Sequence, residues 1–110
     1  MNEIPEQAPP DVALCLFRIT QESLRNIARH ASANRVVIRL RRLNGGLQLT
    51  VKDNGQGFEV KKTSPGLGLS TMRERAEMIG AFFEIESESG QGTRIMVSWV
   101  APALAEDKHS

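Results

Sequence analysis

The chain has 110 residues, and its 14 Lys and Arg nearly balance its 13 Asp and Glu, for a net charge of +1. This length fits one domain, and the near-neutral charge gives no general attraction to nucleic acid or to anionic membranes. No apolar run approaches the ~20 residues that a membrane helix needs. The single cysteine, Cys15, excludes an internal disulfide and fits a reducing compartment.

The first part of the chain predicts a lead-in followed by a helix. Residues 1–11 are polar and rich in proline, unlike a signal peptide, and Asp11 is expected to cap the helix that follows. From residue 12 to residue 31 the apolar side chains recur at spacings of three and four, which indicates an amphipathic helix. They are Ala13, Leu16, Phe17, Leu24, Ile27, Ala28 and Ala31.

Two strands and a tight turn are predicted next. Residues 35–43 alternate between apolar and arginine side chains, and residues 47–53 alternate again, as half-buried strands do. The turn between them reads Asn44-Gly45-Gly46, and these residue types tolerate the positive φ of a hairpin turn. Six of the nine glycines fall between Gly45 and Gly68.

The second half predicts a loop, a helix and two more strands. Residues 54–67 lack periodicity, and a helix is expected from about Gly68 to Ile79 with Gly80 as its stop. Strands are expected over 81–87 and 93–100 around a turn at 89–92, and residues 101–110 form a tail. This order predicts an α+β fold, a two-layer α/β sandwich with a mostly antiparallel sheet and helices on one face, over residues 12–100.

Asp53 is the first residue with chemical interest. It is in phase with Leu47, Leu49 and Val51, on the face expected to be buried, where a carboxylate is costly unless it is hydrogen-bonded. It either caps the following turn or accepts a hydrogen bond from a ligand amine, such as the amino group of adenine.

Glycines follow Asp53 and open the second helix. Gly55 and Gly57 form a flexible turn or the wall of a small-ligand site at the strand end. Gly66 and Gly68 form either a simple junction or a phosphate site, because a helix N-terminus presents unpaired N–H groups. No Lys-Ser or Lys-Thr pair follows, so this is not a Walker A loop.

The first helix carries Glu22 and Asn26 on one face, four residues apart. This face is either simply solvated or holds Mg²⁺ through oxygen ligands. His30 lies a further four residues on, where local hydrogen bonding suits it better than a role as phosphoacceptor.

Together these segments resemble the ATP-binding catalytic domain of two-component sensor histidine kinases, in the GHKL or Bergerat-fold superfamily. The resemblance rests on four motifs in order and covers about residues 12–100. They are QESLRNIARHA (21–31), DNGQGF (53–58), GLGLSTMRERA (66–76) and GTR (92–94). The spelling is most similar to kinases that pair with response regulators carrying a helix-turn-helix output domain.

The resemblance implies a role for each motif. Asn26 would coordinate Mg²⁺, and Glu22 would be the catalytic residue, an acidic side chain that orients or activates the attacking group. Asp53 would accept the adenine amino hydrogen, with Thr93 supporting it and with Gly55 and Gly57 close to the base. Gly66 and Gly68 would close an ATP lid over about residues 54–67 and place N–H groups on the phosphates.

The resemblance also implies what lies outside the chain. The family's dimerisation domain, which bears the phosphoaccepting histidine, is absent from these 110 residues. The expected function is therefore that of an ATP·Mg²⁺-binding kinase domain that phosphorylates a histidine elsewhere and serves a response regulator indirectly. We expect a cytoplasmic location, either free or at the cytoplasmic end of a membrane-bound sensor, without membrane insertion or nucleic-acid binding by this domain.

Three alternatives remain at this point. A serine kinase of the anti-sigma-factor type fits the short chain, although the motif spelling favours the histidine-kinase branch. An RNA-binding module would use the arginines at 35, 39, 41 and 42, but no aromatic residues alternate with them. A nucleotide sensor without transfer activity is disfavoured because Glu22, Asn26 and Asp53 are all present.

Overall fold

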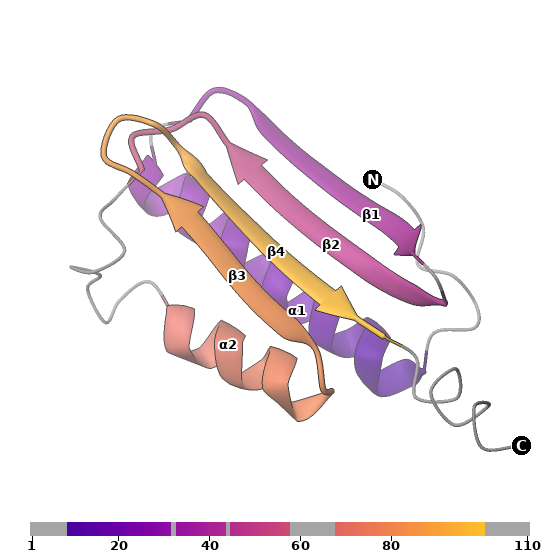
Figure 1. Ribbon diagram of the computed structural model, residues 1–110. Helices are drawn as coiled ribbons and strands as arrows, with labels where there is room; N and C mark the ends of the chain where they lie inside the picture. Colours follow the sequence, from indigo (N-terminus) through magenta and orange to yellow (C-terminus); the bar gives the residue numbers. More distant parts are fainter. Residues whose placement is uncertain (1–8, 32, 44, 58–67, 101–110) are drawn as a thin grey trace, which may run out of the picture.

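The computed structural model describes residues 9–31, 33–43, 45–57 and 68–100. The elements follow the predicted order of helix, hairpin, helix, hairpin (Figure 1). Helix α1 spans Pro10–Asn26 and continues as a π-helical segment, η1, over Ile27–Ala31. The remaining elements are β1 (Val36–Leu43), β2 (Gly46–Asp53), α2 (Leu69–Met78), β3 (Phe82–Ser87) and β4 (Thr93–Trp99).

The four strands form one antiparallel sheet in the order β1-β2-β4-β3. Both α-helices pack on the same face of this sheet, and in Figure 1 α1 passes behind the strands while α2 lies below β3. The α+β sandwich predicted from the sequence is confirmed.

The core lies between the sheet and the two helices. Alternate residues of β2 are buried, as the period of two in its sequence predicts. Ile19 of α1, Met72 of α2 and Val97 of β4 are fully buried and join the two helices to the sheet. The whole cluster comprises Val12, Cys15, Leu16, Ile19, Leu47, Leu49, Val51, Met72, Ala76, Ala81, Phe83, Ile95, Val97 and Trp99.

The start of α1 corrects one prediction. Pro9, not Asp11, is the N-cap residue, and Pro10 is already helical. The carboxylate of Asp11 instead accepts the backbone N–H of Val12 at 2.9 Å. The helix starts earlier because proline's fixed φ suits the first turn and its missing N–H would have no partner there.

The end of α2 confirms its predicted stop. The helix ends at Met78, and Gly80 has a φ of +73°. The N–H of Gly80 donates to the carbonyl of Glu77 at 3.0 Å, and that of Ala81 to Ala76 at 2.9 Å. These two bonds form a Schellman motif, which favours glycine at its left-handed position.

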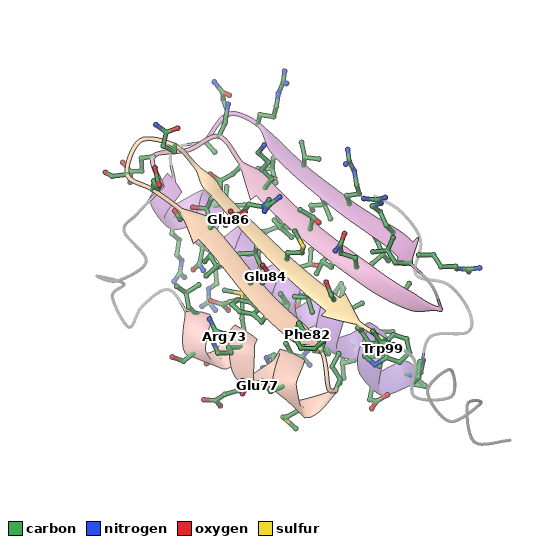
Figure 2. The ribbon with its side chains drawn as sticks, in the orientation of Figure 1. Arg73, Glu77, Phe82, Glu84, Glu86 and Trp99 are labelled. Atoms are coloured by element: carbon green, nitrogen blue, oxygen red, sulfur yellow. The ribbon has the colours of Figure 1, made fainter. Side chains whose placement is uncertain are left out.

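The opposite face of the sheet is open and charged. Phe82, Glu84 and Glu86 project from the outward side of β3, as Figure 2 shows, and Phe82 is 70% exposed. Glu86 forms an ion pair with Arg94 across the β3–β4 ladder. Arg39 and Arg41 of β1 share this outward face, whereas the alternation of the strand puts Arg42 on the other one.

Within the described ranges, no helix combines the length and the apolar character needed to cross a membrane.

Candidate functional site

Asp53 ends β2 on the buried face of the sheet and is only 5% exposed. Its Oδ1 accepts the backbone N–H of Gly55 at 2.7 Å, so one oxygen closes the turn that follows the strand. No hydrogen bond joins Oδ2 to any described residue. The sequence left open a turn cap or a ligand acceptor, and the geometry accommodates both on one carboxylate.

Thr93 lies directly opposite Asp53 in the β2–β4 ladder, and Ser87 lies opposite Thr93 in the β3–β4 ladder. The hydroxyls of Ser87 and Thr93 are 2.8 Å apart, and Ser87 also donates to the carbonyl of Gly92 at 3.2 Å. A cavity of about 650 Å³ opens at this end of β2, β3 and β4, with Asp53 and Thr93 in its lining. The predicted pair is therefore brought together, although forty residues separate its members in the chain.

The glycines after Asp53 pack against the β3–β4 turn. A Cβ on Gly57 would lie 2.2 Å from the carbonyl oxygen of Glu88, and a Cβ on Gly92 would lie 2.3 Å from that of Asp53. The N–H of Gly90 also bonds the carbonyl of Gln56. Gly57 thus serves backbone contact with this turn, a role that the sequence did not indicate.

Asn54 is a structural residue of the site that the sequence reasoning missed. Its Oδ1 accepts the N–H groups of Asn34 and Arg35, at 3.1 and 3.0 Å, and its Nδ2 donates to Asn34 Oδ1 at 2.7 Å. These bonds tie the chain that leaves η1 to the residue after Asp53. Asn is common at such turns, but its partners are twenty residues away, so no local signal reveals them.

Ser87 and Gly92 were also missed as site residues. Gly92 was visible in the GTR motif, and strand alternation would have put Ser87 on the same face as Thr93 only once the β3–β4 register was known. Ser87 supports the Asp53–Thr93 pair from the end of β3, and Gly92 supports it from the β3–β4 turn.

Glu22 of α1 stands beside the first turn of α2. A Cβ built on Gly68 would lie 2.8 Å from Glu22 Oε2, which places this carboxylate at the N-terminus of α2. Gly68 is the N-cap residue of α2 in a left-handed conformation. Glu22 is also 3.7 Å from Arg25, with about 29% of its side chain exposed.

The packing of α1 on α2 fixes this juxtaposition. Met72 is fully buried, and its Sδ is 3.6 Å from the hydroxyl of Ser23. That hydroxyl and the one of Thr20 each bond the carbonyl four residues earlier at 2.8 Å, so the buried polar atoms of α1 are satisfied. Residues 68 and 22, distant in sequence, are thus held together by the hydrophobic layer between the helices.

Asn26 is the last α-helical residue of α1, one turn beyond Glu22, and the helix changes to π geometry directly after it. Single π-turns inside helices are frequent at functional sites. The side chain of His30, Gly66, and residues 58–67 of the expected lid lie outside the described part of the chain.

The described side chains do not form a complete metal site by themselves. No group of three His, Cys, Asp or Glu side chains gathers into a metal site among the described residues. Mg²⁺ usually keeps several waters and is held by one or two protein oxygens together with substrate phosphates. One amide oxygen on Asn26, at the C-terminal end of α1, fits that kind of shared site and not an all-protein cage.

Comparison with known proteins identifies the family. Residues 11–103 match the family described as histidine kinase-, DNA gyrase B-, and HSP90-like ATPase. The sensor protein VraS of Staphylococcus aureus is 42% identical over 99% of this chain, and VraS of Staphylococcus saprophyticus is 43% identical over all of it. The chain spans about a third of the length of these curated relatives, 31% and 32% respectively.

Solved structures agree on the fold. The blue-light activated histidine kinase EL346 of Erythrobacter litoralis superposes with a TM-score of 0.71 at 25% identity, covering 94% of this chain and 34% of that one. The histidine kinase AdeS of Acinetobacter baumannii gives 0.68 at 14% identity, covering 81% and 47%. The chain belongs to the histidine kinase-, DNA gyrase B- and HSP90-like ATPase family, as an ATPase domain of the sensor histidine kinase type.

Proposed function

We propose that this domain binds ATP with Mg²⁺ and transfers the γ-phosphate to a histidine supplied by another domain or protein. The observation that carries the proposal is the meeting of Glu22 with Gly68 at the N-terminus of α2, while Asp53 and Thr93 pair at the adjoining end of the sheet. A helix N-terminus suits phosphate, and a carboxylate oxygen suits the adenine amino group. The phosphate end and the adenine end of ATP thus each have a protein group of complementary chemistry.

Each residue has a defined task in this proposal. Asp53 accepts a hydrogen bond from adenine through Oδ2, and Thr93 supports that end. Gly68 and the first turn of α2 offer N–H groups to phosphate, together with Gly66. Asn26 supplies an amide oxygen to Mg²⁺, which when bound neutralises phosphate charge.

The transfer step places Glu22 beside the acceptor. A ring nitrogen of the acceptor histidine forms the new bond to the γ-phosphorus, while the bond from that phosphorus to the bridging oxygen breaks and ADP leaves. Glu22 orients the attacking imidazole by accepting a hydrogen bond from its other ring N–H. Phosphoryl transfer needs mainly positioning and charge neutralisation, which these groups can provide.

The other classes considered for this chain are less well supported. The relatives over the whole chain are sensor proteins, so a serine kinase of the anti-sigma-factor type has no specific observation in its favour. The basic sheet face lacks aromatic partners on β1, and Arg42 does not share it. We further propose that the domain acts in the cytoplasm and serves a response regulator through its acceptor histidine.

The test uses ATP labelled on the γ-phosphate. The chain is mixed with the histidine-bearing domain of a sensor kinase such as VraS, and we expect acid-labile label on that domain and none on this chain alone. Glu22→Gln should reduce transfer strongly while nucleotide affinity stays close to that of the parent chain. Acid-stable label would indicate serine phosphorylation, and phosphohistidine on the isolated chain would contradict the proposal.

A further inference from the structure

Ser87 belongs to the cavity at Asp53 but has no part in the proposed transfer step. It is the last residue of β3 and lies opposite Thr93 in the β3–β4 ladder. Ser87, Gly92, Thr93 and Asp53 all line the cavity of about 650 Å³. A serine in such a lining influences a ligand either by touching it or by orienting a neighbour that does.

The hydroxyls of Ser87 and Thr93 form a hydrogen-bonded chain with a defined direction. Each of these hydroxyls has one hydrogen to donate. Ser87 gives its hydrogen to the carbonyl of Gly92 at 3.2 Å, and a carbonyl can only accept. In the 2.8 Å contact between the two hydroxyls, Thr93 is therefore the donor. The chain of hydrogen bonds runs from Thr93 to Ser87 and ends at Gly92.

The carbonyl that ends this chain is held by the backbone around it. Gly92 is buried in the β3–β4 turn and has a φ of +81°. A Cβ on Gly57 would lie 2.8 Å from the Gly92 carbonyl oxygen, so the loop after Asp53 packs directly against it. The acceptor for Ser87 is thus part of a tightly packed turn, which fixes the direction of the hydroxyl chain.

The Thr93 hydroxyl can then offer the cavity only an acceptor. Its single hydrogen is committed to Ser87, which leaves a lone pair for a ligand. Asp53 lies directly opposite Thr93 in the β2–β4 ladder, and its Oδ2 is an acceptor as well, because Oδ1 already binds the N–H of Gly55. These two side chains therefore present two acceptors and no donor at this end of the cavity.

We propose that Ser87 is a specificity-determining residue that selects a purine with a 6-amino group over one with a 6-oxo group, because it holds Thr93 as an acceptor. The inference rests on the proposed function and deepens its nucleotide site. The amino group of adenine has two N–H bonds and suits two acceptors. The 6-oxo group of hypoxanthine or guanine would bring a further acceptor against them and leave polar groups unpaired. Ser87 is thus a positioning residue that acts on the base through Thr93.

The test compares ATP with inosine triphosphate, in which a 6-oxo group replaces the amino group. Isothermal titration gives both Kd values for the parent chain and for Ser87→Ala. In the variant the Thr93 hydrogen is released and can be donated to the 6-oxo group. We expect the preference for ATP to fall about five- to tenfold, mainly because inosine triphosphate binds more tightly. A preference that stays at the parent value, or falls only because ATP binds more weakly, overturns the inference.

A double-variant cycle distinguishes positioning of Thr93 from a general loosening of the β3–β4 turn. Thr93→Val lacks the hydroxyl that Ser87 orients, so adding Ser87→Ala to it should leave the ratio of the two Kd values unchanged. A loosened turn would instead change the ratio in both backgrounds. A ratio that shifts in the Thr93→Val background therefore contradicts the positioning role.

Ser98→Ala is the matched control, because it removes another hydrogen-bonded serine hydroxyl from the same sheet. Ser98 lies near the opposite end of β4 from Thr93, and its hydroxyl accepts a hydrogen bond from Nε2 of Gln48 at 3.3 Å. We expect this variant to keep the parent preference for ATP. A fall as large as that of Ser87→Ala would assign the effect to any lost hydrogen bond in the sheet and contradict the specific role of Ser87.

The parent chain separates failure of this inference from failure of the proposed function. A parent chain that binds neither nucleotide contradicts the proposed function, and the role of Ser87 falls with it. A parent chain that binds ATP and inosine triphosphate equally well overturns the specificity inference but leaves nucleotide binding intact. A parent chain that prefers ATP, with the same preference in Ser87→Ala, overturns the role of Ser87 alone.

Discussion

Asp53 uses its two carboxylate oxygens differently, and this division is what the site depends on at the scale of single residues. Oδ1 is committed to the N–H of Gly55 at 2.7 Å. Oδ2 is the oxygen left for a ligand among the described contacts. A residue with only one acceptor at this position could close the turn or bind a donor, but it could not do both.

Asp53→Asn should therefore change specificity as well as affinity. If the amide oxygen keeps the bond to Gly55, the NH₂ group replaces Oδ2 and faces the adenine amino group, so that two donors meet. Loss of a charged acceptor costs ~1.5–3 kcal/mol, which corresponds to roughly ten- to a hundredfold weaker ATP binding. Isothermal titration should show a much smaller loss with inosine triphosphate, which carries an acceptor at that ring position, and equal losses for both nucleotides would refute the adenine assignment.

At the scale of elements, the β3–β4 turn is built against the end of β2. Gly92 and Gly90 both have positive φ, of +81° and +83°. A Cβ on Gly92 would lie 2.3 Å from the carbonyl oxygen of Asp53, whereas a Cβ on Gly90 would meet nothing within 4 Å. Alanine variants at Gly90 and Gly92 therefore separate the free-energy cost of a strained backbone from the cost of a steric overlap.

Gly90→Ala is expected to lower the free energy of unfolding by about 1–2 kcal/mol, the usual cost of a left-handed alanine. Gly92→Ala should cost a further 1–3 kcal/mol or so, because the overlap with Asp53 must be relieved, and it should also weaken nucleotide binding. Urea denaturation of the two variants gives the comparison. Similar decreases in the free energy of unfolding for both variants would mean that the β3–β4 turn makes no tight steric contact with Asp53.

The packing of α2 on α1 is the second feature at the scale of helices and strands. Met72 is fully buried between the helices, whereas Met78 on the same helix is 86% exposed. Met72→Ala should lower the free energy of unfolding by about 2–5 kcal/mol, and Met78→Ala should change it by no more than about 0.5 kcal/mol. Chemical denaturation measures both, and a small effect of Met72→Ala would show that another contact sets the Glu22–Gly68 distance.

At the scale of the whole molecule, nucleotide binding should be coupled to folding. The two proposed halves of the site lie on α1, α2 and the sheet, which come together only in the folded state. A ligand that binds only the folded chain stabilises it by ~2.7 kcal/mol at a hundred times its Kd, or about 10–20 °C in Tm for a domain of this size.

The contribution of Mg²⁺ to this rise in Tm can be measured separately from that of the nucleotide. In a thermal shift experiment ATP with Mg²⁺ should raise Tm more than ATP with EDTA, and Asn26→Ala should remove that difference. Gln21→Ala, an exposed change on the same helix, is the matched control and should retain it. A Mg²⁺ effect that survives in Asn26→Ala would place the metal elsewhere.

The local pattern of the sequence determined the helices and strands of this protein. Periodicity predicted α1, the four strands and the core positions of β2, and Gly80 marked the end of α2, because hydrophobic spacing and left-handed turns depend on neighbouring residues. The motifs indicated Glu22, Asn26 and Asp53 as site candidates by their residue types and resemblance. Asp11 was wrong as the cap, since Pro10 already suits the first helical turn. The apolar face predicted for α1 was also partly wrong, because Phe17 and Leu24 are exposed whereas Val12, Cys15 and Ile19 are buried.

Tertiary structure decided what the site residues touch. The pairing of Asp53 with Thr93, the approach of Glu22 to Gly68, and the clamp of Asn54 on Asn34 join residues twenty or more positions apart. The groove between α1 and α2 likewise exists only because these two helices pack side by side. No sequence period encodes such contacts, because they follow from sheet register and helix packing, which are properties of the assembled core.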